Sequence, residues 1–468
     1  MSRPLWTPEE LEAALGPPTA PMAGAATGVS IDTRTLQNGD LFIAIEGDTH
    51  DGHDHLARAF EAGACAALVS RRLEVPGAQF VVDDTLRGME RLGVAARARA
   101  DASVLAITGS VGKTSAKEMA RAALGAIGPT HASAASFNNH WGVPLTLSRL
   151  PADSRFGVFE IGMNHAGEIT PLVGFVRPHV ALVTTIAPVH IEYFGALEAI
   201  ADAKAEIFSG LEPGGTAVIN RDAPQFERLS QAARALRVLS FGASAGGEAR
   251  LIGCEPEGEG SRVEADIAGE RLSFHLGAPG RHMAENAVGV LLACQALGAP
   301  VKTAAEALAA FQPAKGRGER FTLQAPDGAF TLIDESYNAN PASMRAALAL
   351  LGAAKPGPGG RRIAVIGDML ELGGQGAELH AALAPVLAAN RVDLLFGAGP
   401  LTRALYDAAP AALRAAHAER SDGLREPLVA ALRVGDVVMI KGSNGSRMGP
   451  LAAALREHFT PATAGARL

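Results

Sequence analysis

Short apolar runs that alternate with helical segments give the chain its main pattern. Turns bound each run, and a helical stretch separates it from the next, which is typical of a parallel, doubly wound sheet. In the middle of the chain the predicted strands are "SVLAIT" (103–108), "RFGVFEIG" (155–162), "HVALVTTI" (179–186), "TAVIN" (216–220) and "RVLSF" (237–241).

A second series of the same kind follows "AKGRGER" (314–320). Its predicted strands are "FTLIDE" (330–335), "RIAVIG" (362–367), "VDLLFG" (392–397) and "DVVMIKG" (436–442). Between 262 and 276 the apolar period changes to two around a glycine, Gly269, which predicts a β-hairpin. Before the first series, residues 1–84 combine short strands such as "DLFIAI" (40–45) with a helix near 56–63.

This order of elements predicts three α/β domains. At 468 residues the chain is too long for one hydrophobic core and fits about three domains of ~150 residues each. We place a small N-terminal α/β domain at 1–84 and a central, P-loop-type doubly wound sheet with the small hairpin at 85–313. A C-terminal, Rossmann-like α/β domain occupies 314–468.

Composition and charge exclude several classes of protein. Hydrophobic residues make up 48% and charged residues 19% of the chain, as in soluble globular proteins. A net charge of −7 without a basic block argues against nucleic-acid binding. The three cysteines show no CxxC spacing, which argues against a disulfide framework or a zinc site. No apolar run has the length of a membrane span, and the start lacks a signal-peptide pattern, so we expect a cytoplasmic protein without membrane insertion.

The stretch "AITGSVGKTSAKEM" (106–119) resembles a phosphate-binding loop that lacks one glycine. In the usual pattern, G-x-x-x-x-G-K-[ST], the first glycine would stand where this chain has Ile107. The remaining glycines still allow backbone N–H groups to face an anion at the start of a helix. An ordinary glycine-rich turn is the alternative. The predicted nucleotide-binding residues are Gly109, Ser110, Val111, Gly112, Lys113, Thr114 and Ser115.

Polar residues follow several predicted strands, at the edge where open α/β sheets bind ligands. Besides the loop, they are Glu160, His190, Asp334, Asp368 and Lys441. Glu160 suits a Mg²⁺ ligand, because Mg²⁺ prefers carboxylate and phosphate oxygens. The alternative is a buried acid paired with an arginine. Taken alone, His190 fits a structural histidine, and Lys204 in "AIADAKAEIF" fits a solvated helix lysine.

Taken together, the motifs resemble the Mur ligase family, the ATP-dependent amide ligases that build the peptide of bacterial peptidoglycan. The resemblance covers nearly the whole chain. His140, Trp141 and Ala166 depart from the family pattern near the expected muramoyl-peptide pocket. The motifs are "ITGSVGKTS" (107–115), "FNNHWGVPLTL" (137–147), "EIGMNHAGEI" (160–169), "HIEYFG" (190–195), "AKAEIF" (203–208), "HMAENAVG" (282–289) and "GRGER" (316–320).

Within the family, the last third of the chain separates two specificities. The stretches "DESYNANPASM" (334–344), "VIGDMLELG" (365–373) and "KGS" (441–443) most resemble members that join D-alanyl-D-alanine to UDP-N-acetylmuramoyl-tripeptide. The sibling ligases that add the third residue usually carry a D-N-P-R motif, and "YNANPASM" occupies the comparable region. The resemblance therefore implies an acid–amino-acid ligase that acts through an acyl phosphate.

The resemblance also implies residue roles around ATP. Lys113, Thr114 and the loop would hold the phosphates and Mg²⁺. Glu160, His190 and Lys204, the last as a CO₂-derived carbamate, would hold two Mg²⁺ ions. Three more positions follow by matching motif: Asn286 near the adenine, Arg317 near the γ-phosphate and Asp334 at the ribose.

The same resemblance implies the domain roles and the substrate-binding residues. It makes 1–84 the UDP-substrate domain, 85–313 the ATP-binding domain and 314–468 the ligase domain, in a chain that we expect to be monomeric. The UDP end would meet Ser30, Thr33 and Arg34, and the muramoyl peptide Asn138, Asn139 and His165. D-Alanyl-D-alanine would meet Tyr337, Asn338, Asn340 and Lys441.

Three other activities compete with this interpretation. A Mur-type ligase that adds the third residue and a folylpolyglutamate synthase-like ligase share the loop and the modified lysine. The N-terminal domain argues against the second. A regulatory P-loop NTPase would need a guanine-reading N-K-x-D motif, and "INRD" (219–222) matches it poorly.

Overall fold

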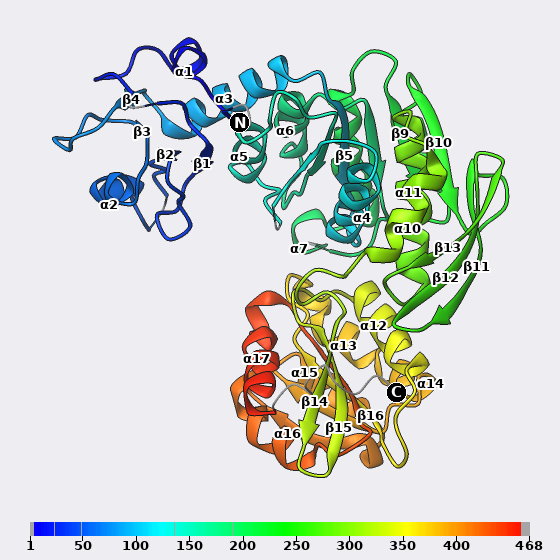
Figure 1. The fold of residues 1–468 in the computed structure, drawn as a ribbon. Helices are drawn as coiled ribbons and strands as arrows, with labels where there is room; N and C mark the ends of the chain where they lie inside the picture. The colour runs from blue at the N-terminus through cyan, green and yellow to red at the C-terminus, as the bar shows by residue number, and fades with distance from the viewer. Residues whose placement is uncertain (1–3, 23, 48, 135, 190, 460–468) are drawn as a thin grey trace.

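The computed structural model contains three sheets, each in its own α/β unit (Figure 1). It describes residues 4–22, 24–47, 49–134, 136–189 and 191–459. The predicted architecture is confirmed: a small parallel sheet is followed by a nine-stranded central sheet and a six-stranded C-terminal sheet. The ranges 1–84, 85–313 and 314–468 each contain one sheet, while the boundaries themselves stay predictions.

The N-terminal sheet has four parallel strands in the order β1-β2-β3-β4. One face packs on α2, and the other packs on α1 and α3. Helix α1 begins at a capping box in which Thr7 and Glu10 bond each other's backbone. The elements are α1 (Pro8–Leu15), β1 (Gly28–Ser30), β2 (Asp40–Ile43), α2 (Leu56–Glu61), β3 (Ala66–Val69), β4 (Gln79–Val81) and α3 (Thr85–Arg99).

The central sheet runs β13-β12-β11-β10-β9-β8-β5-β7-β6. The predicted hairpin is present as β12 and β13, and a third strand that we did not predict, β11, continues it. The strands are β5 (Ser103–Thr108), β6 (Thr130–Ala132), β7 (Phe156–Glu160), β8 (Val180–Val183), β9 (Thr216–Asn220), β10 (Arg237–Gly242), β11 (Ala249–Glu257), β12 (Gly260–Ile267) and β13 (Glu270–Leu276).

Both faces of this sheet are buried, which explains its continuous apolar runs. In β5, Val104 and Ala106 join the core shared with α3, α6 and α8, whereas Leu105 and Ile107 join the core under α4, α10 and α11. The helices are α4 (Lys113–Gly125), α5 (Gly142–Ser148), α6 (Ile169–Val176), α7 (Ile191–Phe194), α8 (Leu197–Ala205), α9 (Phe226–Ala232), α10 (Arg281–Ala296) and α11 (Val301–Ala307).

The C-terminal sheet runs β14-β15-β19-β16-β17-β18, and only the β14–β15 pair is antiparallel. Its elements are β14 (Glu319–Ala325), β15 (Gly328–Glu335), α12 (Pro341–Ala353), β16 (Arg362–Gly367), α13 (Gly376–Ala381), α14 (Ala384–Ala389), β17 (Leu394–Ala398), α15 (Thr402–Ala408), β18 (Arg414–Ala418), α16 (Arg425–Ala431), β19 (Val437–Lys441) and α17 (Met448–His458). The edge strands β14 and β18 were not predicted.

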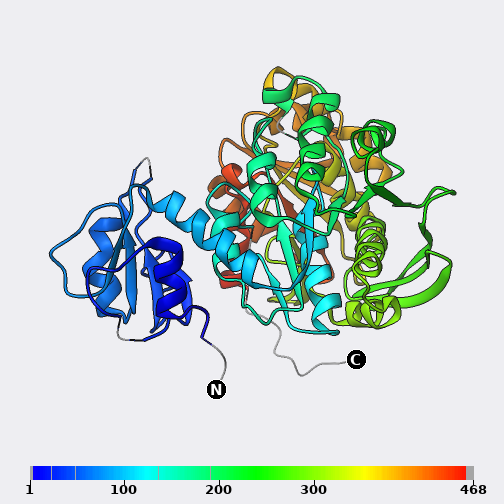
Figure 2. The same ribbon diagram turned by 90° about the horizontal axis from the view of Figure 1, so that it is seen from above.

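Helix α3 joins the first two units. It extends from the N-terminal sheet to the central one, and Figure 2 shows the N-terminal unit standing to one side. Met89 and Leu92 of α3 belong to a core that includes residues of both sheets. Trp6 adds a direct link, since its indole N–H donates to the Ser148 carbonyl at 2.8 Å. The N-terminal sheet is therefore attached to the central unit through packing as well as through the chain.

No helix in the described part of the chain combines the length and the apolar character that a bilayer span requires.

Arg97 of α3 anchors the end of α6, and its removal is expected to destabilise the protein. Its guanidinium donates to the carbonyls of Val176 at 2.8 Å and Arg177 at 2.9 Å, and the residue is 6% exposed. Arg97→Ala would leave buried carbonyls without donors and lower the free energy of unfolding by about 2–3 kcal/mol. Urea denaturation followed by circular dichroism measures this. Arg87→Ala, at an exposed position of the same helix, should leave the midpoint near wild type; equal losses in both variants would contradict the assignment.

Candidate functional site: a cavity between the central and C-terminal sheets

A cavity of about 430 Å³ lies where strand ends of the central sheet face strand ends of the C-terminal sheet. The phosphate-loop region and β7 contribute on one side, and β15, α12 and β19 contribute on the other. Predicted site residues that line it are Ser110, Val111, Gly112, Lys113, Thr114, Ser115, Asn138, Glu160, Asn286, Arg317, Tyr337, Asn338, Asn340 and Lys441.

The loop between β5 and α4 has the backbone conformation that an anion-binding site requires. Gly109 has φ 147° and Gly112 has φ 89°, values that other residues rarely adopt. A Cβ at Gly109 would lie 2.0 Å from the Thr184 Oγ1, and that hydroxyl donates to the Val111 carbonyl at 2.6 Å. The N-terminus of α4 follows at once, so its free N–H groups and dipole favour an anion here.

Lys113 is held beside this loop. Its Nζ donates to the Gly109 carbonyl at 2.7 Å. Burial lowers the pKa of Lys113, the Arg317 guanidinium lowers it further, and the Glu160 carboxylate opposes the shift. Two cations therefore share the cavity, and a phosphate between them would relieve their repulsion.

Glu160 ends β7 and is 1% exposed. The Thr114 hydroxyl donates to its Oε2 at 2.9 Å, and the Asn138 amide donates to its Oε1 at 2.7 Å. Its partners are thus neutral, unlike the arginine of the alternative interpretation. A carboxylate beside a threonine hydroxyl next to a phosphate loop fits Mg²⁺, although the described residues contain no cluster of three or more His, Cys, Asp or Glu side chains.

Lys204, on α8, is buried rather than solvated. The residue is 2% exposed and lies in the last turn of the helix. Burial lowers the pKa of Lys204 well below its usual value, and the charge of Lys113 adds to the shift. Both effects favour the neutral amine, the form that can react as a nucleophile. His190, the neighbouring candidate, lies outside the described residues.

Arg317 reaches the cavity from the linker that precedes β14. Its guanidinium carbon lies 4.0 Å from the centre of the Tyr337 ring. The Nη2 donates to the Ser136 hydroxyl of the central unit at 3.4 Å. A single side chain from the linker therefore touches both walls of the cavity.

Three family models together match most of the chain. They are the Mur ligase family catalytic domain at 25–127, the Mur ligase middle domain at 107–294 and the Mur ligase glutamate ligase domain at 316–444. A UDP-N-acetylmuramoyl-tripeptide–D-alanyl-D-alanine ligase of Rickettsia prowazekii is 31% identical over 95% of this chain and 98% of its own length. The enzyme of that name from Escherichia coli is 34% identical over 92% of this chain and 94% of its own length. The chain belongs to the Mur ligase family.

Solved structures agree with this assignment. A crystal structure of MurF from Acinetobacter baumannii superposes with a TM-score of 0.84 at 29% identity, covering 97% of this chain and 99% of that one. The Thermotoga maritima MurF ligase in complex with ADP has a TM-score of 0.76 at 23% identity, over 92% and 97% of the two chains, and supports the fold.

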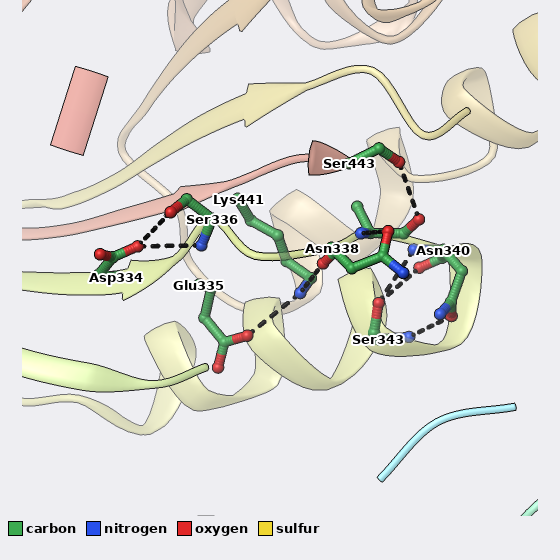
Figure 3. Close-up of polar contacts among 9 residues, drawn as sticks. Asp334, Glu335, Ser336, Asn338, Asn340, Ser343, Lys441 and Ser443 are labelled. Carbon is green, nitrogen blue, oxygen red and sulfur yellow. Dashed lines mark hydrogen bonds and ion pairs between the residues drawn. The ribbon is translucent and has the colours of Figure 1, made fainter. Parts of the chain in front are cut away.

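The C-terminal wall of this Mur ligase contains a carboxylate that sequence reasoning missed. Asp334, the predicted ribose residue, does not line the cavity; it accepts hydrogen bonds from the Ser336 backbone at 3.0 Å and hydroxyl at 2.6 Å. The next residue, Glu335, lines the cavity and pairs with Lys441 at 3.1 Å (Figure 3). Adjacent strand residues point to opposite faces, so Asp334 and Glu335 were both candidates, and only the structure shows which of them faces the cavity.

Helix α10 also contributes more than the predicted Asn286. His282 and Glu285 line the same cavity. Burial lowers the pKa of His282, and burial raises the pKa of Glu285. Glu285 and Asn286 stand three and four residues after His282, so the i, i+3 and i+4 spacing could have identified the group.

Several predicted substrate residues lie outside the cavity. Ser30 ends β1, and Thr33 and Arg34 lie in the turn that follows, where the Arg34 guanidinium pairs with Asp32. Asn139 accepts a hydrogen bond from the Gly142 N–H at 2.9 Å, and His165 is exposed. Their roles in this Mur ligase stay predictions.

Asp368 has a structural role in the C-terminal unit. Its Oδ1 accepts hydrogen bonds from the Thr402 backbone N–H at 2.7 Å and hydroxyl at 2.6 Å. It lines a separate cavity of about 550 Å³ rather than the one that contains the phosphate loop. The strand-end pattern thus grouped residues that the structure divides between two cavities.

The loop geometry predicts that Gly109→Ala weakens nucleotide binding. The added methyl group would collide with Thr184, and φ 147° would strain the alanine backbone. We expect the dissociation constant for ATP, measured by isothermal titration calorimetry with Mg²⁺ present, to rise about 10- to 100-fold. Gly125→Ala at the end of α4, where a Cβ meets nothing within 4 Å, is the matched control. Unchanged affinity in Gly109→Ala would rule out the loop as the phosphate site.

Proposed function

We propose that this Mur ligase joins D-alanyl-D-alanine to the terminal carboxylate of UDP-N-acetylmuramoyl-tripeptide, with ATP converted to ADP and phosphate. The observation that carries the proposal is the single cavity that contains Lys113 and Glu160 of the central unit and Arg317 of the linker. Nearly full-length similarity to ligases of that name supports the choice of substrates. The reaction belongs to peptidoglycan precursor synthesis.

The chemistry explains why a ligase needs a phosphate loop. A carboxylate is a poor electrophile, so the tripeptide carboxylate first attacks the γ-phosphorus of ATP, and ADP leaves. The dipeptide amine then attacks the resulting acyl phosphate and loses a proton. A tetrahedral intermediate forms, and it expels inorganic phosphate to give the amide.

Phosphoryl transfer depends on alignment and charge stabilisation. Lys113 and Arg317 would neutralise charge on the phosphates, and the loop N–H groups would fix their position. Thr114 and Glu160 would hold Mg²⁺, and two Mg²⁺ ions would add further positive charge when bound. Because Arg317 comes from the linker, movement of the C-terminal unit would complete the site and exclude water.

Lys204 would serve as a carbamate. A neutral amine reacts with CO₂ and loses a proton, which converts a buried cation into an anionic metal ligand. The burial of Lys204 and its lowered pKa favour this reaction. His190 is proposed as its partner at the second Mg²⁺.

The remaining assignments complete the proposal. Ser30, Thr33 and Arg34 would bind the UDP end, at the carboxyl end of β1 where a parallel sheet offers a ligand site. The muramoyl peptide would meet Asn138, Asn139 and His165, and the nucleotide would meet Asn286 and Asp334. Tyr337, Asn338 and Asn340 are proposed for the dipeptide. We further propose that the protein acts as a monomer in the cytoplasm.

The proposal predicts that nucleotide turnover requires both substrates. Phosphate release from ATP should be slow with the protein alone and should rise when UDP-muramoyl-tripeptide and D-alanyl-D-alanine are present together, with the pentapeptide product detected by mass spectrometry. Substitution of D-alanyl-D-alanine by a single amino acid should give no product. Equal ATP hydrolysis without either substrate would instead indicate an NTPase. Addition of a third residue to a UDP-muramoyl-dipeptide would favour the sibling Mur-type ligase. Extension of a folate would favour the folylpolyglutamate synthase-like ligase.

The carbamate makes a separate prediction. Lys204→Ala should lose most ligase activity, added bicarbonate should not restore it, and a short-chain carboxylic acid should restore part of it. In the wild-type protein, ¹³CO₂ should give a carbamate signal by NMR that Lys204→Ala lacks. Lys302→Ala, at an exposed lysine of α11, is the control. Full activity without a lysine at 204 would refute the ligand role.

A further inference from the structure

Lys441 ends β19 and is almost completely enclosed, with a side chain that is 3% exposed. Its Cα partner in the parallel register is Glu335, at the end of β15. The Nζ donates to the Glu335 Oε2 at 3.1 Å and to the Asn338 carbonyl at 3.0 Å (Figure 3). An ammonium group has three hydrogens, and two of them are used within the protein. Most of its donor capacity therefore serves the protein itself rather than a substrate.

The two acceptors, Glu335 and Asn338, stand before and after Tyr337 along the chain. This residue carries the ring on which the Arg317 guanidinium rests, 4.0 Å from the ring centre. Its backbone N–H donates to the Gly316 carbonyl at 3.0 Å, and the Gly318 N–H donates to the Asp334 carbonyl at 2.8 Å. The loop after β15 and the linker that carries Arg317 are thus fixed to each other on both sides of the arginine.

Arg317 in turn faces the phosphate loop. It lines the cavity together with Lys113 and reaches the Ser136 hydroxyl of the central unit. A continuous series of contacts therefore runs from Lys441 through the loop at 335–338 to Arg317. Ser443 strengthens the same region, because its hydroxyl donates to the Ala339 carbonyl at 3.2 Å and accepts from the Leu370 N–H at 2.9 Å.

We propose that Lys441 is a positioning residue for the phosphoryl-transfer step, which holds Glu335 and the 335–338 loop so that Tyr337 places Arg317 at the phosphates. This inference rests on the proposed function and replaces the sequence-based assignment of Lys441 to the dipeptide. Without the ammonium group, the Glu335 carboxylate would lose its counter-charge in the cavity that receives ATP. It would then repel the phosphates, and the Asn338 carbonyl would lose its donor.

Lys441→Met tests the proposal, because methionine keeps much of the aliphatic stem and removes the charge. The decisive assay measures exchange of label between ADP and ATP with UDP-muramoyl-tripeptide present and D-alanyl-D-alanine absent. This exchange reports formation and reversal of the acyl phosphate alone. We expect it to slow about 10- to 100-fold, since small misplacement of a group at the reacting centre has effects of this order. In the full reaction kcat should fall, while KM for D-alanyl-D-alanine should stay near its wild-type value.

The opposite pattern would overturn the proposal. If Lys441 grips the dipeptide, Lys441→Met should exchange label at the wild-type rate and show a raised KM for D-alanyl-D-alanine. Failure of the wild-type protein to ligate would count against the proposed function instead. Lys355→Met, at an exposed lysine of the same unit, should behave as wild type in both assays.

Two further variants keep the test independent of folding. Lys441→Arg retains a donor for Glu335 and should recover part of the exchange that Lys441→Met loses. Tyr337→Leu changes an exposed residue, so it should fold normally, yet it removes the ring beneath Arg317. Its exchange should slow as in Lys441→Met. Wild-type exchange in Tyr337→Leu would contradict the series of contacts on which the proposal depends.

Discussion

The cavity of this Mur ligase depends on positive charge that the fold encloses. Lys113 lines the cavity, and Lys204 is buried on α8 outside its lining. Both have lowered pKa values, and in each case burial is the largest cause and another cation adds to it. Enclosed charges are costly unless they are paired. Glu160 offsets part of the charge of Lys113, and the phosphates of ATP would offset more of it. A carbamate on Lys204 would replace the ammonium group of that residue. The same arrangement that costs stability in the empty protein therefore favours binding of an anionic substrate.

The two walls of the cavity use their acids differently. On the central side, Glu160 accepts hydrogen bonds from neutral Thr114 and Asn138, which leaves its charge available to a cation. On the C-terminal side, Glu335 is neutralised by Lys441. One carboxylate is thus available for a metal ion, and the other holds a loop in place. Both residues stand at the carboxyl end of a parallel strand, and the two sets of strand ends meet at this cavity. The different partners that each carboxylate finds there give the two acids different roles.

Much of the fold could be predicted from local patterns, and the errors have physical causes. The central strands were found because burial on both faces produces continuous apolar runs. Strands β6, β11, β14 and β18 were missed, since each contains exposed or part-buried positions and lies in an antiparallel or edge region of its sheet. In the site, Lys113, Thr114 and Glu160 were found through motif and strand-end position. Glu335 was missed in favour of Asp334, because a strand end does not itself reveal which of two adjacent residues faces the cavity.

The sequence by itself determined the three α/β units, the phosphate loop and the membership of the Mur ligase family, because these depend on local periodicity and on residues close together along the chain. Tertiary structure decided which of the strand-end residues share a cavity. It placed Asp368 in a different cavity, tied Lys441 to Glu335 and enclosed Lys204, which the sequence pattern alone would have left in solvent. The reason is that burial and charge pairing arise between segments far apart in the chain, and they are set only when the sheets pack together.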